Sequence, residues 1–182
     1  MSEAKSTSTA IFAGGCFWCT EAAFEQLEGV LDATSGYIGG SSETANYKAV
    51  CGGNTGHAEA IRITYDPAKI SFEQLLAVFF DAHDPTQLNR QGNDIGSQYR
   101  SAIFYADDNQ RQAAEAKIRE LTAAKAFARP IVTTLESALT FYPAEDYHQD
   151  YARLNPDQSY IQAVSVPKVC KVREKHGKLL RK

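Results

Sequence analysis

The sequence has no long hydrophobic run. None of its 182 residues lies in a stretch that approaches the ~18 apolar residues of a membrane-spanning helix, and residues 1–8 lack the apolar core of a secretory signal peptide. No internal repeat or low-complexity tract is found either. These absences argue against a membrane protein or a secreted protein, and we expect a cytoplasmic chain.

Excess positive charge is also missing. The formal net charge is −3, whereas proteins that bind nucleic acid carry an excess of Lys and Arg on their binding surface. No nucleic-acid partner is therefore expected. The length predicts a single domain over 1–182, with a flexible N-terminus over 1–8 and a C-terminal extension over 156–182. Seven Lys or Arg residues over 168–182 indicate a solvated terminal segment. Without an apolar stripe that would mark an interface, we expect a monomer.

Cysteine is scarce, and its spacing does not favour a zinc centre. Cys16 and Cys19 form one CxxC pair, while Cys51, His57 and Cys170 are scattered without a second CxxC or a close His pair. We therefore expect no metal and no cofactor. Without a secretory signal, the four cysteines are expected to be reduced and available for catalysis rather than held in structural disulfides.

The hydrophobic pattern alternates between strand and helix periods. Strands are predicted over 9–13, 30–38, 58–65, 99–106 and 131–135, and helices over 16–28, from a capping box at Ser71 and Gln74, over 108–125 and over 144–154. This order predicts an α+β two-layer sandwich with a ferredoxin-like split βαβ core. Two long polar connections, 36–57 and 84–98, are expected to build active-site loops.

Cys16 is the strongest candidate nucleophile. It follows a predicted strand and a Gly-Gly turn and opens a helix, where the helix dipole and free backbone N–H groups stabilise a thiolate. Its pKa is therefore predicted to fall. The alternative is a buried core cysteine. The spacing of Cys16 and Cys19 is also that of dithiol oxidoreductases.

Glu59 is a candidate general acid. It faces the same side of its predicted strand as Ile61 and Ile63, so its carboxyl group is expected to be desolvated and its pKa raised. A protonated carboxyl group can donate a proton to a leaving oxygen near neutral pH. The alternative is a glutamate at a strand end that forms a salt bridge.

Several aromatic and polar side chains are candidate substrate contacts. Phe17 and Trp18 are consecutive on a helix and cannot both face one core, so one of them is expected to line a pocket. The other candidates lie in or beside the long loops, or in a Tyr-rich segment, where packing is the alternative role of a tyrosine. They are Tyr47, Asp94, Tyr99 and His148.

A series of short motifs resembles one family over about 9–155. The motifs are Gly15-Cys16-Phe17-Trp18 with Glu21, Gly36-Tyr37, Tyr47, Thr55-Gly56-His57-Ala58-Glu59, His83-Asp84-Pro85, Arg90-Gln91-Gly92-Asn93-Asp94, Gln98-Tyr99-Arg100-Ser101, and Ala144-Glu145 with Tyr147-His148-Gln149. In this order they resemble peptide methionine sulfoxide reductase, A class. The resemblance implies that Cys16 attacks the sulfoxide sulfur and that Glu59 protonates the oxygen, with help from Tyr47 and Tyr99. Water leaves and a sulfenic acid forms.

The resemblance also implies the substrate and the reductant. Phe17 and Trp18 would hold the S-methyl group, Asp94 would orient a polar group of the substrate, and His148 is a further candidate for substrate binding. The substrate would be the S epimer of methionine sulfoxide, in oxidised proteins or as the free amino acid. Thioredoxin would supply the electrons.

The sequence departs from the common family pattern at the resolving cysteine. Cys19 stands where many members have Gly, and the Gly-rich C-terminal tail with its recycling cysteine is missing. Cys19 lies three residues from Cys16 on one helical turn, so it is the first candidate resolver. Cys170 is the second, and direct reduction by an external thiol is the third. Cys51 is interpreted as a structural or bystander thiol.

Two other functions are compatible with the cysteines. A general dithiol-disulfide oxidoreductase would use Cys16 and Cys19, but it leaves Glu59 and the tyrosines without tasks. A zinc-stabilised binding domain would carry about one metal per chain.

Overall fold

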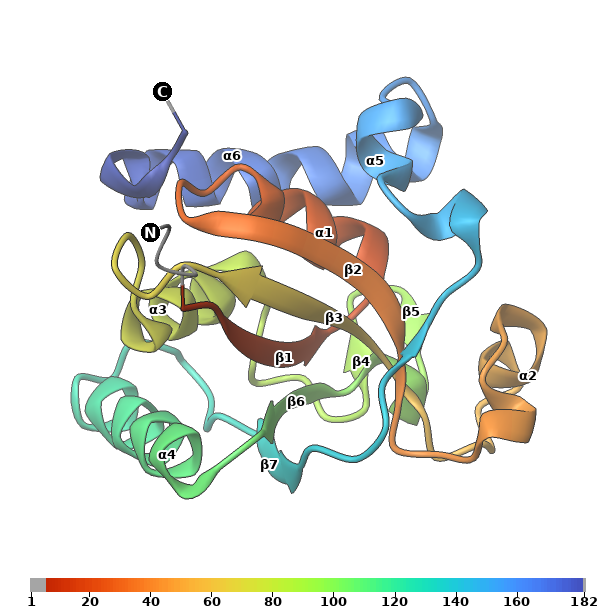
Figure 1. Ribbon diagram of the computed structural model, residues 1–182, viewed down its shortest axis with the longest axis horizontal. Coiled ribbons are helices and arrows are strands. Elements are labelled where there is room, and N and C mark those ends of the chain that lie inside the picture. Colours follow the sequence, from red (N-terminus) through yellow and green to blue (C-terminus); the bar gives the residue numbers. More distant parts are fainter. Residues whose placement is uncertain (1–5, 182) are drawn as a thin grey trace, which may run out of the picture.

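The core of the protein is a six-stranded sheet. The computed structural model describes residues 6–181, and its strands have the order β7-β6-β1-β3-β2-β8 (Figure 1). Their bounds are β1 Ser8–Gly14, β2 Val30–Ile38, β3 Ala58–Tyr65, β6 Ser101–Tyr105, β7 Thr134–Ser137 and β8 Tyr142–Pro143. All neighbours are antiparallel except β6 and β7. The four middle strands, β6-β1-β3-β2, have the order of a split βαβ unit, which confirms the predicted fold class.

Helices cover one face of this sheet. The long helices are α1 Phe17–Glu25, α3 Phe72–Ala82, α4 Asp108–Ala123 and α6 Val166–Lys175. The short ones are η1 Ser42–Thr44, α2 Tyr47–Cys51, η2 Ser97–Tyr99, η3 Asp146–His148, α5 Tyr151–Leu154, η4 Ile161–Ser165 and η5 Gly177–Leu179. A small hairpin pairs β4 Arg90–Gln91 with β5 Asp94–Ile95. No helix of residues 6–181 is long and apolar enough to cross a membrane.

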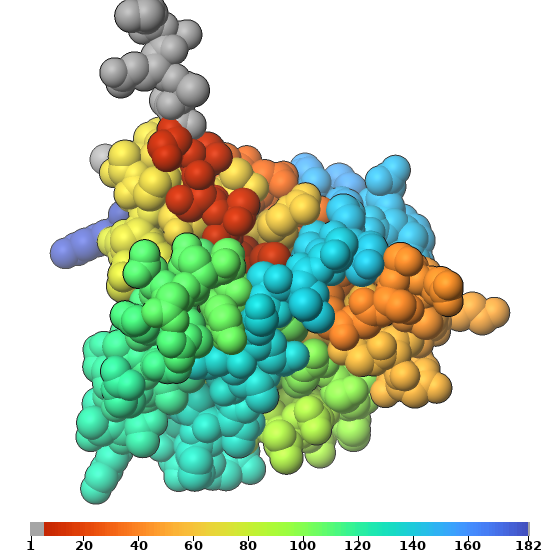
Figure 2. Space-filling view, turned by 60° about the horizontal axis from the view of Figure 1, so that its bottom comes forward, coloured from red at the N-terminus to blue at the C-terminus, as the bar shows by residue number. Residues whose placement is uncertain are grey.

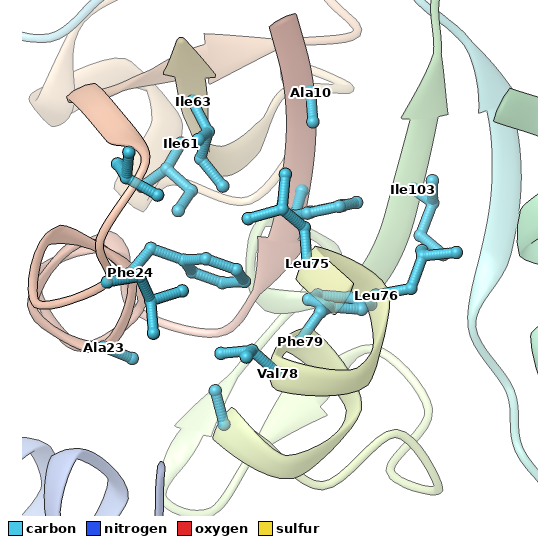
Figure 3. Packing of buried hydrophobic residues seen from close by; sticks show 14 of the residues in the cluster. Ala10, Ala23, Phe24, Ile61, Ile63, Leu75, Leu76, Val78, Phe79 and Ile103 are labelled. Carbon is cyan, nitrogen blue, oxygen red and sulfur yellow. The ribbon is translucent and has the colours of Figure 1, made fainter. Parts of the chain in front are cut away.

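The main hydrophobic core lies between the sheet and helices α1 and α3. Phe24 of α1, Phe79 of α3 and Ile61 of β3 are fully buried and point toward one another (Figure 3). Helix α3 begins at the predicted capping box, because the Ser71 hydroxyl accepts from the Gln74 N–H at 3.1 Å and the Gln74 side chain accepts from the Ser71 N–H at 2.9 Å.

The segment before β8, residues 138–141, packs on the opposite face of the sheet. The Phe141 ring lies against Gly36, where a Cβ atom would come within 2.4 Å of it, and the Arg62 guanidinium stands 4.9 Å from its centroid. Figure 2 shows this part of the chain in cyan, crossing the surface between the green residues around β6 and the orange residues around α2. Side chains of this face, such as Phe104, form a second, smaller core cluster.

Three predicted elements have other bounds in the structure than the sequence indicated. The strand predicted over 99–106 begins at Ser101, because 97–99 form the turn η2. The strand predicted over 131–135 is Thr134–Ser137, because Val132 donates its N–H to the Pro85 carbonyl at 2.8 Å and pairing with β6 starts only at Thr134. The helix predicted over 144–154 is split into η3 and α5 by Asp150, whose φ of +58° is left-handed.

The prediction of a solvated basic tail is wrong. Helix α6 packs against α1, beside which it lies in Figure 1, and also against α3, and its residue Val172 is fully buried. Lys171, Arg173 and Lys175 of this helix are exposed, so α6 is amphipathic although its composition is strongly charged. At the other end, Ser8 already pairs with Tyr65 in the sheet, so the predicted flexible segment 1–8 overlaps β1; residues 1–5 lie outside the described part.

Candidate active site

Cys16 sits at the junction of β1 and α1. It is the N-cap residue of α1 and is 8% exposed, with its carbonyl accepting from the Cys19 N–H at 3.1 Å. The turn before it requires glycine: Gly15 has a φ of +95°, and a Cβ atom there would lie 2.7 Å from Cγ of Gln91. The Gly-Gly pair therefore lets the loop that carries Gln91 approach the start of the helix.

Glu59 faces the start of the same helix from β3. Its Oε1 accepts the Phe17 backbone N–H at 3.2 Å, and its side chain is 1% exposed. Burial raises the pKa of Glu59 to about 8, against the lowering effect of the Phe17 hydrogen bond. The predicted rise in pKa is confirmed. No salt bridge within 6–181 involves Glu59, so the alternative of a strand-end glutamate in a salt bridge is wrong.

The predicted fall in the pKa of Cys16 is wrong. Burial raises its pKa well above the ordinary value, and the hydrogen bond to Cys19 and the nearby charge of Glu59 act in the same direction. These effects outweigh the backbone N–H of Trp18 at the helix start. The hydrogen bond from Cys16 lowers the pKa of Cys19 to about 7, against the burial of that side chain. In the reduced dithiol, Cys16 therefore holds its proton more tightly than Cys19 does.

The two consecutive aromatics diverge. Phe17 is fully buried, with its ring centroid 5.6 Å from Tyr37 and 5.1 Å from His148. Trp18 is half-buried, stacks on Tyr151 at 3.9 Å, and donates its Nε1–H to Nδ1 of His148 at 3.0 Å. This bond places the proton of a neutral His148 on Nε2, which has no hydrogen-bond partner among the described residues.

Two tyrosines from the long connections complete this side of the site. Tyr47 opens α2, and its ring centroid lies 4.4 Å from that of His148. Burial raises the pKa of both Tyr47 and Tyr99, and the charge of Glu59 adds to the rise in each case. Both hydroxyls are therefore protonated at neutral pH and can donate hydrogen bonds. Tyr47 and Tyr99, which lie in or beside the two long connections, both come near Glu59.

Two functional candidates were missed by the sequence analysis. The Tyr160 hydroxyl donates to Oδ2 of Asp94 and accepts from the Sγ–H of Cys19 at 3.9 Å. Glu145 accepts from the Tyr37 hydroxyl at 2.9 Å and from the Tyr47 N–H at 3.1 Å, so it holds α2 against the sheet. Glu145 stands in one of the quoted motifs, whereas Tyr160 carried no signal because its segment was interpreted as an extension.

The other two cysteines lie outside the buried pair. Cys51 is exposed at the end of α2, close enough to Tyr47 for a side-chain hydrogen bond, so it borders the site and is not a remote thiol. Cys170 is exposed on α6, and no hydrogen bond within 6–181 joins its side chain to Cys16 or Cys19.

The comparison with known families agrees with this arrangement. The family described as peptide methionine sulfoxide reductase matches residues 8–180. The chain belongs to that family. A relative from Deinococcus radiodurans, called peptide methionine sulfoxide reductase MsrA, is 56% identical over 172 residues, which are 94% of this chain and 84% of that protein. The family that the sequence motifs indicated is thus confirmed for this reductase.

Solved structures share its fold. The reduced form of Mxr1 from Saccharomyces cerevisiae has a TM-score of 0.78 at 34% identity, covering 87% of this reductase and 91% of that chain. Mxr1 in complex with Trx2 has a TM-score of 0.56 at 25% identity, covering 84% and 89%.

Proposed function

We propose that Cys16 is the nucleophile and Glu59 the general acid in the reduction of the S epimer of methionine sulfoxide. The observation that carries this proposal is the hydrogen bond of 3.2 Å from the Phe17 N–H to Glu59, because it ties a buried carboxyl group to the residue that follows Cys16. With a pKa raised by burial to about 8, this carboxyl group holds a proton at neutral pH.

The chemistry balances without an external proton donor. Glu59 protonates the sulfoxide oxygen while the Cys16 sulfur attacks the sulfoxide sulfur, and the proton of Cys16 passes to the same oxygen. Water leaves, and a sulfonium bonded to Cys16 remains. Water then adds at the Cys16 sulfur, which releases methionine, leaves a sulfenic acid and returns a proton to Glu59. The sulfoxide sulfur is reduced by two electrons and Cys16 is oxidised by two.

The surrounding side chains would bind and orient the sulfoxide. The hydroxyls of Tyr47 and Tyr99, which keep their protons, would donate to the oxygen as it takes up charge. The rings of Phe17 and Trp18 would contact the S-methyl group. His148 Nε2, which has no partner within 6–181, and Asp94 would hydrogen-bond the polar groups of the substrate.

Cys19 would then resolve the sulfenic acid. Its sulfur attacks the Cys16 sulfur, an S–S bond forms, and the S–O bond breaks to release hydroxide, which takes up a proton to become water. A dithiol of thioredoxin would reduce the disulfide, and the complex of the relative Mxr1 with Trx2 supports this partner. Because Cys16 is 8% exposed and Cys19 only 1%, the incoming thiol would attack Cys16.

One equivalent of a peptide methionine sulfoxide, added without reductant, tests the resolving step. The native protein is expected to form one intramolecular disulfide, detected by mass spectrometry. Cys19→Ser is expected to accumulate a sulfenic acid that dimedone traps, whereas Cys170→Ser and the control Cys51→Ser still form the disulfide. An intramolecular disulfide in Cys19→Ser would show that another thiol is the resolver.

We also propose a cytoplasmic location and a monomer. All four cysteines are free thiols, which suits a reducing compartment. Cell fractionation and light scattering of the purified protein test these two points.

A further inference from the structure

The thiol of Cys19 is buried, so its proton has no direct path to water. The residue is 1% exposed, and helix α1, which carries it, contacts both η4 and α6. A cysteine attacks a sulfenic acid as a thiolate, so Cys19 has to lose its proton before or during the resolving step. At a position without contact to water, a group of the protein must take that proton.

The hydroxyl of Tyr160 is in contact with this thiol. Tyr160 directly precedes η4, and its oxygen accepts from the Sγ–H of Cys19 at 3.9 Å. The Tyr160 ring stands edge-on to that of Trp18, with the ring centroids 6.0 Å apart and the planes at 80°. Because Trp18 directly precedes Cys19 in α1, this contact holds the hydroxyl beside the turn of helix that presents the sulfur.

Asp94 accepts the proton of the same hydroxyl. Its Oδ2, at the start of β5, is the acceptor of the Tyr160 O–H. A tyrosine hydroxyl has one proton and can accept a second hydrogen bond, so the thiol, the phenol and the carboxylate form one chain of hydrogen bonds. The sulfur at one end of this chain is enclosed, whereas Asp94 at the other end is only half-buried. The chain therefore leads from the buried thiol towards solvent.

We propose that Tyr160 and Asp94 form a proton relay that activates Cys19 for the resolving step. This inference rests on the proposed role of Cys19 as the resolver. As the Cys19 sulfur attacks the sulfur of Cys16, its proton passes to the Tyr160 oxygen. The proton of Tyr160 passes to Asp94, which then gives it to water. The S–S bond forms, the S–O bond breaks, and the hydroxide that leaves takes up a proton, so a thiol and a sulfenic acid become a disulfide and water.

The relay moves negative charge to the sulfur without leaving a charged tyrosine. Burial raises the pKa of Tyr160 far above its ordinary value, so this hydroxyl does not ionise by itself and the two protons move together. After the shift, Tyr160 donates the proton that it has just received to the Cys19 thiolate, which gives the buried charge a hydrogen bond. Asp94 becomes neutral in the same step, so no second negative charge opposes the thiolate.

The alternative acceptor is the hydroxyl of the sulfenic acid itself. In the reduced dithiol, the hydrogen bond from Cys16 lowers the pKa of Cys19, but the S–H group that makes this bond is gone once Cys16 is oxidised. In the alternative path, the hydroxyl that leaves Cys16 takes the Cys19 proton directly. That path uses neither Tyr160 nor Asp94, so substitutions at these two residues distinguish it from the relay.

The experiment measures a competition between Cys19 and dimedone for the sulfenic acid. In a Cys51→Ser, Cys170→Ser background, one equivalent of a peptide methionine sulfoxide is added at a series of dimedone concentrations. Mass spectrometry gives the ratio of the dimedone adduct of Cys16 to the Cys16–Cys19 disulfide. This ratio depends on the rate of the resolving step and not on the rate at which the sulfenic acid forms, so an effect of Asp94 on substrate binding does not enter.

Two substitutions break the relay at different points. Tyr160→Phe keeps the ring and removes the hydroxyl, whereas Asp94→Asn keeps an oxygen that accepts from Tyr160 but cannot take up its proton. Each is expected to raise the ratio of adduct to disulfide at least about tenfold near pH 7. The double variant is expected to raise it no further, because both substitutions interrupt the same path. The matched control Tyr151→Phe removes the hydroxyl of another tyrosine that packs on Trp18, and its ratio is expected to stay at the native value.

The pH dependence separates a relay from a purely structural effect. From about pH 7 to about pH 9, the deficit of Tyr160→Phe relative to the native protein is expected to shrink, because hydroxide then removes the proton without the relay. A native ratio in Tyr160→Phe or in Asp94→Asn would overturn the inference, and so would a deficit that is the same at every pH. An intramolecular disulfide in Cys19→Ser of the otherwise native chain would instead overturn the proposed resolver, and the inference with it.

Discussion

The Phe17 N–H and the Glu59 carboxylate oxygen are 3.2 Å apart, and this bond joins the first turn of α1 to the middle of the sheet. It uses one of the backbone N–H groups that a helix start leaves without a partner. The acceptor is a carboxyl group that burial keeps largely protonated, since its pKa is raised to about 8. This hydrogen bond, together with the packing of Phe24 against the core side of β3, fixes the helix that presents Cys16 relative to the strand that presents the acid.

Replacement of this acid tests its role in proton transfer. Glu59→Gln keeps the side-chain oxygen that accepts from Phe17 but cannot give up a proton at neutral pH. We expect kcat/KM for a peptide sulfoxide to fall by about 10²-fold or more. The control is Glu28→Gln, because Glu28 is exposed and away from this contact. An activity within about twofold of the native value in Glu59→Gln would remove Glu59 from the mechanism.

The same substitution is expected to raise stability at alkaline pH. The folded-state pKa of Glu59 lies above its ordinary value of 4.5, so the folded protein holds more protons than the unfolded chain between these values. Its contribution to the free energy of unfolding is therefore present below about pH 4.5 and is lost as the pH rises to about 8. In urea denaturation, the free energy of unfolding of Glu59→Gln relative to that of the native protein should increase as the pH rises, by at most about 5 kcal/mol. A constant difference between the two proteins from about pH 5 to about pH 9 would contradict this.

The single tryptophan gives a spectroscopic probe of the site. Trp18 donates to Nδ1 of His148, and burial lowers the pKa of His148 below its ordinary value of 6.5. Protonation of His148 must break this bond and places a cation against the indole, which quenches its emission. We expect fluorescence to fall on acidification with a midpoint below 6.5, and His148→Phe to remove this step. A midpoint at or above 6.5 would mean that the imidazole is solvated.

Helix α6 is expected to contribute to stability. Val172→Ala deletes two buried methyl groups at the contact with α1 and α3, and it should lower the free energy of unfolding by about 2 kcal/mol. Val166→Ala is the matched control, because Val166 in the same helix is 37% exposed and should cost less than about 0.5 kcal/mol. Equal effects of the two substitutions in urea denaturation would mean that α6 does not pack in solution.

The sequence predicted the fold well where periodicity and end signals agree. β3 has the predicted bounds, and α3 starts at the predicted capping box of Ser71 and Gln74. It predicted β7 less well, because an edge strand is defined by its partner and the apolar pair Ile131 and Val132 comes before the pairing with β6. α6 was missed because its few buried side chains, such as Val172, stand among Lys and Arg residues.

The active site, like the fold, could be predicted from the sequence only in part. Glu59 could be predicted as a buried acid, since the alternation of its strand fixes the side on which it lies. The pKa of Cys16 could not, because the helix start favours a thiolate while burial and the neighbouring Cys19 oppose it, and the balance depends on packing. Tyr160 reaches Cys19 only through the return of the C-terminal segment over α1, a long-range contact that no local sequence pattern reports.

The most direct test of the account is the fate of a racemic methionine sulfoxide peptide incubated with the purified protein and dithiothreitol. Each epimer is followed by chiral chromatography, with Cys16→Ser and Glu59→Gln in parallel. The account predicts that the native protein consumes the S epimer alone, that Cys16→Ser consumes neither, and that Glu59→Gln is strongly slowed. Consumption of both epimers at similar rates, or undiminished activity in Cys16→Ser, would contradict it.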